Sequence, residues 1–167
     1  MGLDFSTTTY YFLKQLEDNN IQYRDITNPL ILSKAIKNKI EQAGAFNANL
    51  RDGVSMTRFI YWLKNEIDIN SSNEIIVSKY LETLRTNNEL FHSLSFETIS
   101  AFGKNAALPH YRVNKISNAD FKEDNIYLVD SGAQYYDGTT DITRTIILGN
   151  PSAEQKDRFT RVLKGHI

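Results

Sequence analysis

Residues 130–145 read DSGAQYYDGTTDITRT, and this stretch carries the clearest structural signal in the second half of the chain. The apolar run at 125–129 and the β-branched run at 141–148 flank its centre, and each is typical of a strand. Between them, Asp137-Gly138 is a short-range hairpin signal. The stretch therefore predicts two antiparallel strands, with Asp130 closing the first and Asp141 opening the second.

Side-chain alternation predicts that the two carboxylates share one face of this hairpin. A two-residue turn at Asp137-Gly138 gives Asp130 and Asp141 the same parity and therefore the same side of the sheet. The same turn sets Asp141 opposite Gln134, about 13 Å along the strand from Asp130 at roughly 3.3 Å per residue. Direct opposition requires a loop centred on Tyr135-Tyr136, or a bulge. Both arrangements remain open at the level of sequence.

Two carboxylates on one sheet face repel each other unless a positive charge lies between them. A divalent cation is the economical solution, and hard oxygen ligands suit manganese or magnesium better than copper. The bare spacing is equally consistent with a purely structural interpretation, in which Asp130 is a turn residue and Asp141 caps the end of a strand.

The amino-acid composition indicates the broad class of the protein. The 167 residues are 41% hydrophobic and carry 19 Lys and Arg against 20 Asp and Glu, which is typical of a soluble globular domain and gives no general attraction to nucleic acid or anionic membrane. The absence of cysteine excludes disulfides, thiolate zinc sites and cysteine nucleophiles. No signal peptide and no bilayer-spanning apolar run is visible, so a cytoplasmic location is the default expectation.

The rest of the pattern places helices before the sheet. We expect a helix at 7–19 and a short strand at 21–26, and then a helical region at 33–64. Gly44 and Gly53 each cost about 1 kcal/mol in a helix, which allows a kink or break in that region. The expected apolar positions of the region are Ile36, Ile40, Ala43, Leu50, Val54, Phe59, Ile60 and Leu63.

A second helix is predicted to begin at a capping box made by Ser71 and Glu74. Its expected buried stripe is Ile76, Tyr80, Leu81 and Leu84. Alternation predicts a further strand at 94–99, and Ser152 with Gln155 predicts the start of a last helix. Long helices followed by an antiparallel sheet make the fold class α+β.

The stretch at 130–145 closely resembles the first metal-ligand segment of Xaa-Pro aminopeptidases (aminopeptidase P), which are pita-bread metallopeptidases related to methionine aminopeptidase, prolidase and creatinase. The likeness extends to SFETISAFGKNAALPHYRV at 95–113, to FTRVLKGHI at 159–167 and to the helical region at 28–63. The resemblance implies that residues 29–167 form the first half of a pita-bread domain. It also implies that residues 1–28 are the tail of a preceding creatinase N-terminal-like domain.

The resemblance further implies a dinuclear metal centre, with manganese as the expected metal. In the family, two Asp, one His and two Glu hold the metals; Asp130 and Asp141 match the two Asp, and Asp141 matches the one that bridges both ions. His110 matches a histidine that contacts the substrate near the scissile bond, although without the family it reads as an ordinary loop histidine. Thr143 resembles a residue that orients a ligand carboxylate, and Asp137 matches no ligand.

The implied activity is removal of the N-terminal residue from peptides with proline at the second position. The family's remaining ligands follow the matched part, so we expect a truncated catalytic domain that binds metal weakly, is inactive alone, and has the downstream half as a partner. We also expect an exposed apolar patch on the strands at 125–129 and 141–148. The alternatives are a non-catalytic pita-bread module that binds peptides or proteins, and an inert remnant of a split gene.

Overall fold

The computed structural model describes residues 1–167 and divides them into two compact units, Met1–Ile40 and Glu41–Ile167. In the first unit, β1 (Gly2–Leu3) pairs in parallel with β2 (Arg24–Asp25). Between these strands in sequence lies α1 (Tyr10–Asp18), and α2 (Leu30–Ala35) follows them. The helix predicted at 7–19 is confirmed, whereas the strand predicted at 21–26 is reduced to two residues.

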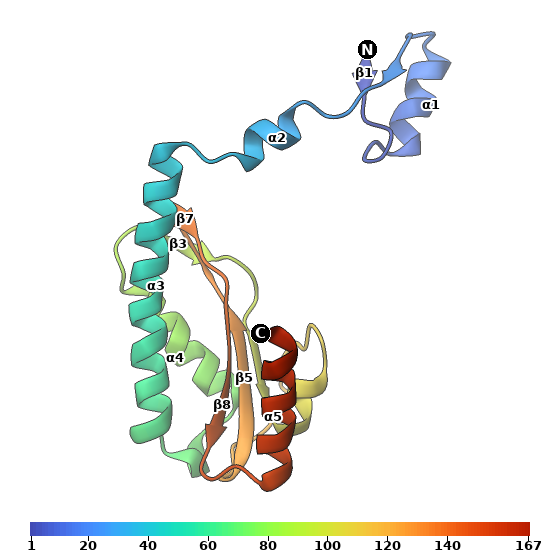
Figure 1. Cartoon of the computed structure of the whole chain (residues 1–167). Helices are drawn as coiled ribbons and strands as arrows, with labels where there is room; N and C mark the ends of the chain where they lie inside the picture. Colours follow the sequence, from blue (N-terminus) through green and yellow to red (C-terminus); the bar gives the residue numbers. More distant parts are fainter. The chain divides into compact units, whose positions relative to one another are not determined.

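The second unit is built on a three-stranded antiparallel sheet in the order β4-β5-β8 (Figure 1). These strands span Ile99–Phe102, Asn125–Ser131 and Ile142–Leu148. Two helices, α3 (Lys39–Asn65) and α4 (Glu74–Thr86), pack on one face of the sheet, and α5 (Ala153–His166) follows β8. Helices first and an antiparallel sheet later confirm the predicted α+β class.

A smaller sheet, in the order β3-β6-β7, continues the hairpin beyond the end of β5. Its strands are β3 (Phe91–Leu94), β6 (Ala133–Tyr135) and β7 (Gly138–Thr139). Tyr135 pairs with Gly138 in this sheet, and Asp130 pairs with Thr143 in the larger one. Both pairs belong to one register, so β5 to β8 form a single long hairpin that crosses from one sheet to the other.

The turn of this hairpin is at Tyr136 and Asp137, one residue before the predicted Asp137-Gly138 turn. The physical reason is the close approach of α3. A Cβ atom on Gly138 would lie 2.9 Å from the Cβ atom of Ala48, and one on Gly44 would overlap the carbonyl oxygen of Asp137. Gly138 is therefore needed for helix-to-hairpin packing, and the turn forms beside it.

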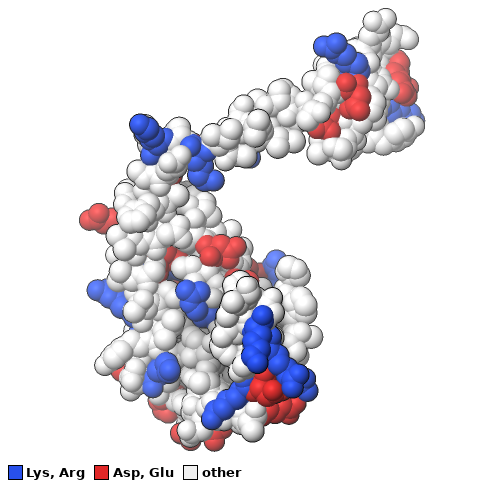
Figure 2. Space-filling model, in the orientation of Figure 1, with Lys and Arg blue, Asp and Glu red and all other residues white.

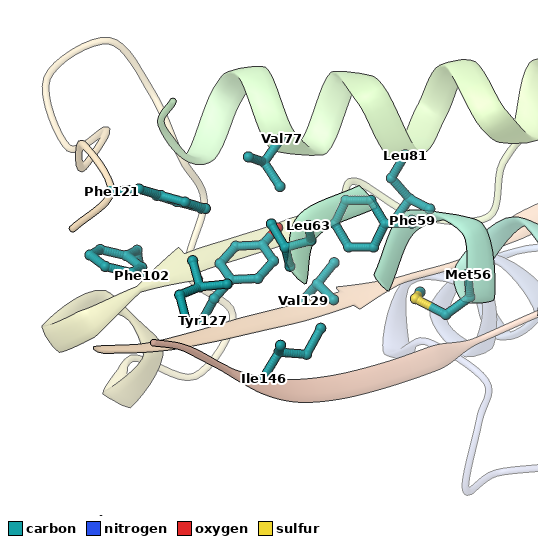
Figure 3. Packing of buried hydrophobic residues seen from close by; sticks show 11 residues of the cluster. Met56, Phe59, Leu63, Val77, Leu81, Phe102, Phe121, Tyr127, Val129 and Ile146 are labelled. Carbon is teal, nitrogen blue, oxygen red and sulfur yellow. The ribbon is translucent and has the colours of Figure 1, made fainter. Parts of the chain in front are cut away.

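One apolar core joins α3 and α4 to the larger sheet (Figure 3). Phe59 of α3, Val77 of α4 and Tyr127 of β5 are all fully buried in it. The rings of Phe102 and Phe121 stack at one end of the core with centroids 4.6 Å apart. The remaining members of the cluster are Met56, Leu63, Leu81, Val129, Ile146 and Leu148.

The buried face of α3 differs from the predicted apolar stripe. Leu50 and Val54 are exposed, and the buried positions are Gly44, Ala48, Asp52, Ser55, Met56, Phe59 and Leu63. Small residues face the hairpin turn and large ones face the sheet, so the distance to the neighbouring element sets residue size along this face. α3 also runs unbroken through Gly44 and Gly53, and the break occurs between α2 and α3 instead.

Of three further local predictions, two are wrong and one is confirmed. Ser71 lies in a short 3-10 helix, η1 (Ile69–Ser71), and α4 is capped instead by Asn73, whose side-chain oxygen accepts the Ile76 N–H. The strand predicted at 94–99 is wrong, because β3 ends and β4 begins within it. The capping box of α5 is confirmed, with Ser152 and Gln155 each bonded to the other's backbone.

The buried stripe of α4 also differs from the prediction. Ile76 is exposed, and Val77 and Leu81 carry the helix's contact with the core. Tyr80 and Leu84 pack at its margin. No helix in the structure combines the length and the apolar character needed to cross a membrane.

Candidate metal centre

The hairpin places the two predicted metal ligands on one face of the sheet. Asp130, at the end of β5, lies opposite Thr143 of β8. Asp141 is two residues from Thr143 and so points to the same side, one diagonal step from Asp130. Such diagonal neighbours are about 7–8 Å apart and within reach of each other's side chains. The observed register lies between the two arrangements considered from the sequence. Asp141 is neither directly opposite Asp130 nor about 13 Å along the strand from it.

Neither carboxylate is neutralised by a basic side chain. Asp130 accepts a 2.6 Å hydrogen bond from the Thr143 hydroxyl, and Asp141 makes no side-chain hydrogen bond. The ion pairs of the protein all involve other residues. Two unpaired carboxylates side by side are a donor set that suits a hard divalent cation. No group of three or more metal-ligating side chains gathers anywhere in the structure, so these two oxygen donors stand as a partial set.

His110 lies in an exposed turn and is not hydrogen-bonded to the carboxylate pair. The turn runs from Leu108 to Tyr111 and is closed by a 3.2 Å bond from the Tyr111 N–H to the Leu108 carbonyl. Pro109 occupies the second position, and His110 the third with a φ of 55°, which is the pattern of a type II turn. No hydrogen bond links His110 to Asp130 or Asp141.

The segment that carries His110 is anchored by a buried carboxylate. Glu74, the first residue of α4, is fully buried and accepts bonds from the backbone N–H groups of Phe102 and Ala119. It also accepts bonds from the Asn105 side chain at 3.0 Å and from the Tyr111 hydroxyl at 2.8 Å. Burial raises the pKa of Tyr111, and the neighbouring Glu74 raises it further. Glu74 therefore fixes both ends of the loop around His110.

At Gly132, which lies between Asp130 and Asp141 in sequence, the strands are too close together to leave room for a side chain. A Cβ atom on Gly132 would overlap the Thr140 carbonyl oxygen and the Ser95 hydroxyl. Ser95 bridges the crossing: its N–H donates to the Gly132 carbonyl at 3.1 Å and its hydroxyl donates to the Thr140 carbonyl at 3.0 Å. The two strands therefore approach each other closely at the point where the chain passes from Asp130 to Asp141.

Asp137 is a structural residue at the tip of the hairpin. The Arg51 guanidinium pairs with its carboxylate at 2.5 and 3.2 Å and lies 4.8 Å above the centre of the Tyr135 ring. The sequence already separated Asp137 from the candidate ligands, and this ion pair gives the reason. The Arg51 contact itself, across 86 residues, leaves no local signal in the sequence.

A family model described as Metallopeptidase family M24 matches residues 43–167, which is most of the chain. The chain belongs to this family. The two carboxylates, the hairpin that carries them and the helices behind it all lie inside the matched region.

Curated relatives in several animals give a narrower likeness within the family. The chain is 40% identical over 161 residues to Xaa-Pro aminopeptidase ApepP of Drosophila melanogaster, a match covering 96% of this chain and 26% of that protein. It is 42% identical over 162 residues to Xaa-Pro aminopeptidase 2 of Mus musculus, covering 97% of this chain and 24% of that one. The chain spans about a quarter of the length of these relatives.

Solved structures support the same fold. X-prolyl aminopeptidase of Caenorhabditis elegans, described as a cytosolic enzyme with a di-nuclear active site, matches with a TM-score of 0.73 at 33% identity, over 86% of this chain and 27% of that one. The prolidase of Pyrococcus horikoshii matches with a TM-score of 0.76 at 26% identity, over 98% and 45%. The chain therefore has part of the pita-bread architecture of these enzymes.

Proposed function

We propose that this chain is part of a metal-dependent aminopeptidase that removes the N-terminal residue from peptides with proline at the second position. The observation that carries the proposal is the pair of unneutralised carboxylates, Asp130 and Asp141, on one face of the hairpin within the family match. The likeness to Xaa-Pro aminopeptidases supports this substrate class. Residues 29–167 would form the first part of the catalytic domain, and residues 1–28 the tail of a preceding one.

Asp130 and Asp141 would hold two divalent metal ions, for which manganese is our choice. When bound, such a pair of ions polarises a peptide carbonyl and lowers the pKa of water. The Thr143 hydroxyl keeps one Asp130 oxygen in a fixed orientation. His110, held in its turn by the Glu74 network, would contact the peptide close to the scissile bond. We place this enzyme in the cytoplasm.

Residues 1–167 alone should be catalytically silent. Two carboxylates are fewer than the six or so oxygen ligands that a hard divalent ion usually takes. The ion would complete its shell with water and bind weakly, and no further acidic or histidine side chain gathers beside the pair. The rest of the pita-bread domain would supply the remaining ligands, either as a partner chain or as a continuation of the same chain.

The test is reconstitution of activity. The purified chain should release no N-terminal residue from an Xaa-Pro peptide, with or without manganese. Adding the separately expressed downstream half of the Drosophila relative should give manganese-dependent release that Asp141→Asn in this chain abolishes. Turnover by the chain alone, or reconstituted turnover that survives Asp141→Asn, would contradict the proposal. Specific peptide binding without turnover in the reconstituted mixture would favour a non-catalytic binding module, and no binding at all an inert remnant.

A further inference from the structure

Four buried polar side chains from different elements meet directly behind the candidate metal centre. They are Asp52 of α3, Arg85 of α4, Tyr135 of β6 and Thr140, which precedes β8; each is at most 2% exposed. The Asp52 carboxylate is their common acceptor. Arg85 donates to both of its oxygens, at 2.7 and 2.9 Å. Tyr135 donates to one oxygen at 3.2 Å, and Thr140 to the other at 2.9 Å.

Thr140 connects this cluster to the hairpin backbone. Its hydroxyl donates to Asp52 and accepts the N–H of Ala133 at 2.9 Å. Ala133 and Thr140 are register partners across the hairpin, because the Thr140 N–H donates to the Ala133 carbonyl at 2.9 Å. The Thr140 side chain, held by Asp52, therefore links both strands of the hairpin. Thr140 is the immediate neighbour of Asp141.

Stability alone explains this cluster poorly. A buried ion pair gains little over apolar packing, because both charges must leave water. Here the pair is also incompletely satisfied, since Nη1 of Arg85 is buried without a hydrogen-bond partner. Buried polar groups of this kind are retained in some proteins because they select one arrangement of the chain. The arrangement available here is the register of the hairpin, in which a slip would move Asp141 away from Asp130 or to the other face.

We propose that Asp52, held by Arg85, is a positioning residue for the metal-ligand pair, and that it acts through the Thr140 hydroxyl. The proposal rests on the proposed function, in which Asp130 and Asp141 bind metal. The cluster fixes the hairpin from the helix side, and Ser95 fixes it from the other side. Together they hold Asp141 at its diagonal position beside Asp130.

The test uses two substitutions at one position and a matched control. Thr140→Val keeps the shape and removes the hydroxyl, Thr140→Ser keeps the hydroxyl, and Val77→Ala weakens the apolar core on α4 without altering Asp52, Arg85, Tyr135 or Thr140. Manganese affinity is measured from the loss of the free-ion electron paramagnetic resonance signal. Amide exchange at Ala133 and the cross-strand proton contact between Gly132 and Asp141 are followed by nuclear magnetic resonance without metal.

Thr140→Val should weaken manganese binding about tenfold, the lower end of what loss of a supporting residue costs a metal site. It should also speed exchange at Ala133 and weaken the contact between Gly132 and Asp141. Thr140→Ser should match the unsubstituted chain in all three measurements. Val77→Ala should lower stability but leave manganese affinity unchanged. Unchanged affinity in Thr140→Val, or an equal loss in Val77→Ala, would overturn the proposal.

Failure of the proposed function gives a different pattern. If the unsubstituted chain binds no manganese, the assignment of Asp130 and Asp141 as ligands falls, and the contact between Gly132 and Asp141 becomes the deciding measurement. Its loss in Thr140→Val and return in Thr140→Ser would still show that the cluster sets the hairpin register. Its persistence in Thr140→Val would overturn the positioning role as well.

Discussion

Gly132 lies between the two candidate ligands, at a place where the opposing strand occupies the space of a side chain. In Gly132→Ala, the new methyl group would overlap the Thr140 backbone, which can move only if the hairpin opens. We expect a loss of about 3 kcal/mol in the free energy of unfolding, the upper end of ordinary overpacking. Urea denaturation measures this loss.

Gly53→Ala is the matched control, because a Cβ atom at this position of α3 meets nothing within 4 Å. Replacing a helical glycine by alanine should raise the free energy of unfolding by up to about 1 kcal/mol. Equal and small effects of the two substitutions would contradict the close approach at Gly132.

Glu74 has an equally local consequence for the loop that carries His110. Glu74→Gln keeps the size of the side chain but turns one acceptor oxygen into a donor that faces the N–H, amide or hydroxyl donors around it. Breaking such a buried network should cost about 1–3 kcal/mol. Hydrogen exchange should then rise in residues 103–119 more than in β5. A uniform rise across both segments would show that Glu74 supports the whole core and has no special role at this loop.

Among the elements, α5 carries the apolar surface that the sequence placed on the strands. Phe159 and Val162 are 58% and 75% exposed, whereas Ile126 and Ile147 of the sheet are half-buried. Phe159 and Val162 line a groove that also includes Ile126 and Thr145. The predicted patch therefore lies mainly on the helix, because α5 partly covers the strands beneath it.

This surface predicts self-association. Exposed apolar side chains on one helix face favour contact between molecules. A double substitution, Phe159→Ser with Val162→Ser, should reduce the fraction of dimers and larger species in sedimentation velocity experiments. The matched control is Lys156→Ser on the same helix, which should leave that fraction unchanged. Monomeric behaviour of the unsubstituted chain at all concentrations would contradict this prediction.

The elements also show how far sequence reasoning extends. The strands β5 and β8 and the capping box of α5 were predictable, because their signals are local: apolar runs, β-branched residues and a Ser–Gln pair. The buried face of α3 was not, because Gly44, Ala48 and Asp52 are buried by contacts with a hairpin some ninety residues away. Apolar periodicity cannot detect a face built from glycine, alanine and a paired carboxylate.

The candidate site was likewise only partly predictable from the sequence. The shared face of Asp130 and Asp141 followed from side-chain alternation together with a two-residue turn. The exact register depended on where the turn forms, and that is decided by the contact of Gly138 with Ala48. The supporting residues Asp52 and Arg85 carried no signal in the sequence beyond their charge at otherwise helical positions, and Glu74 was assigned only to a capping box.

Figure 2 shows basic and acidic side chains interspersed over the viewed face of the molecule, as expected from a net charge of −1. Large titration effects on stability should therefore come from buried groups. Burial raises the pKa of Tyr127, and burial together with the Asp52 carboxylate raises the pKa of Tyr135. The folded protein holds both protons more tightly than the unfolded chain does.

This difference predicts a loss of stability at alkaline pH. A pKa that is raised by folding contributes stability that is complete below the unfolded value, near pH 10 for tyrosine, and is lost as the pH rises above it. Urea unfolding should show a constant contribution from these groups between about pH 8 and 10, and above about pH 10 a fall in the free energy of unfolding of about 1.4 kcal/mol per pH unit for each such group.

Tyr127→Phe should make this alkaline decline shallower, and the exposed Tyr136→Phe should leave it as steep as before. A decline of the same slope in all three proteins would assign the effect to other groups.

The proposed function requires that Asp130 and Asp141 together form a site for a divalent metal ion. The most direct measurement is a titration of the isotope-labelled chain with manganese, following the paramagnetic broadening of each backbone amide resonance. Broadening should appear first at Asp130, Asp141 and Thr143, and Asp141→Asn should remove it while leaving the rest of the spectrum unchanged. Broadening centred on another acidic region, or unaltered by Asp141→Asn, would contradict the claim.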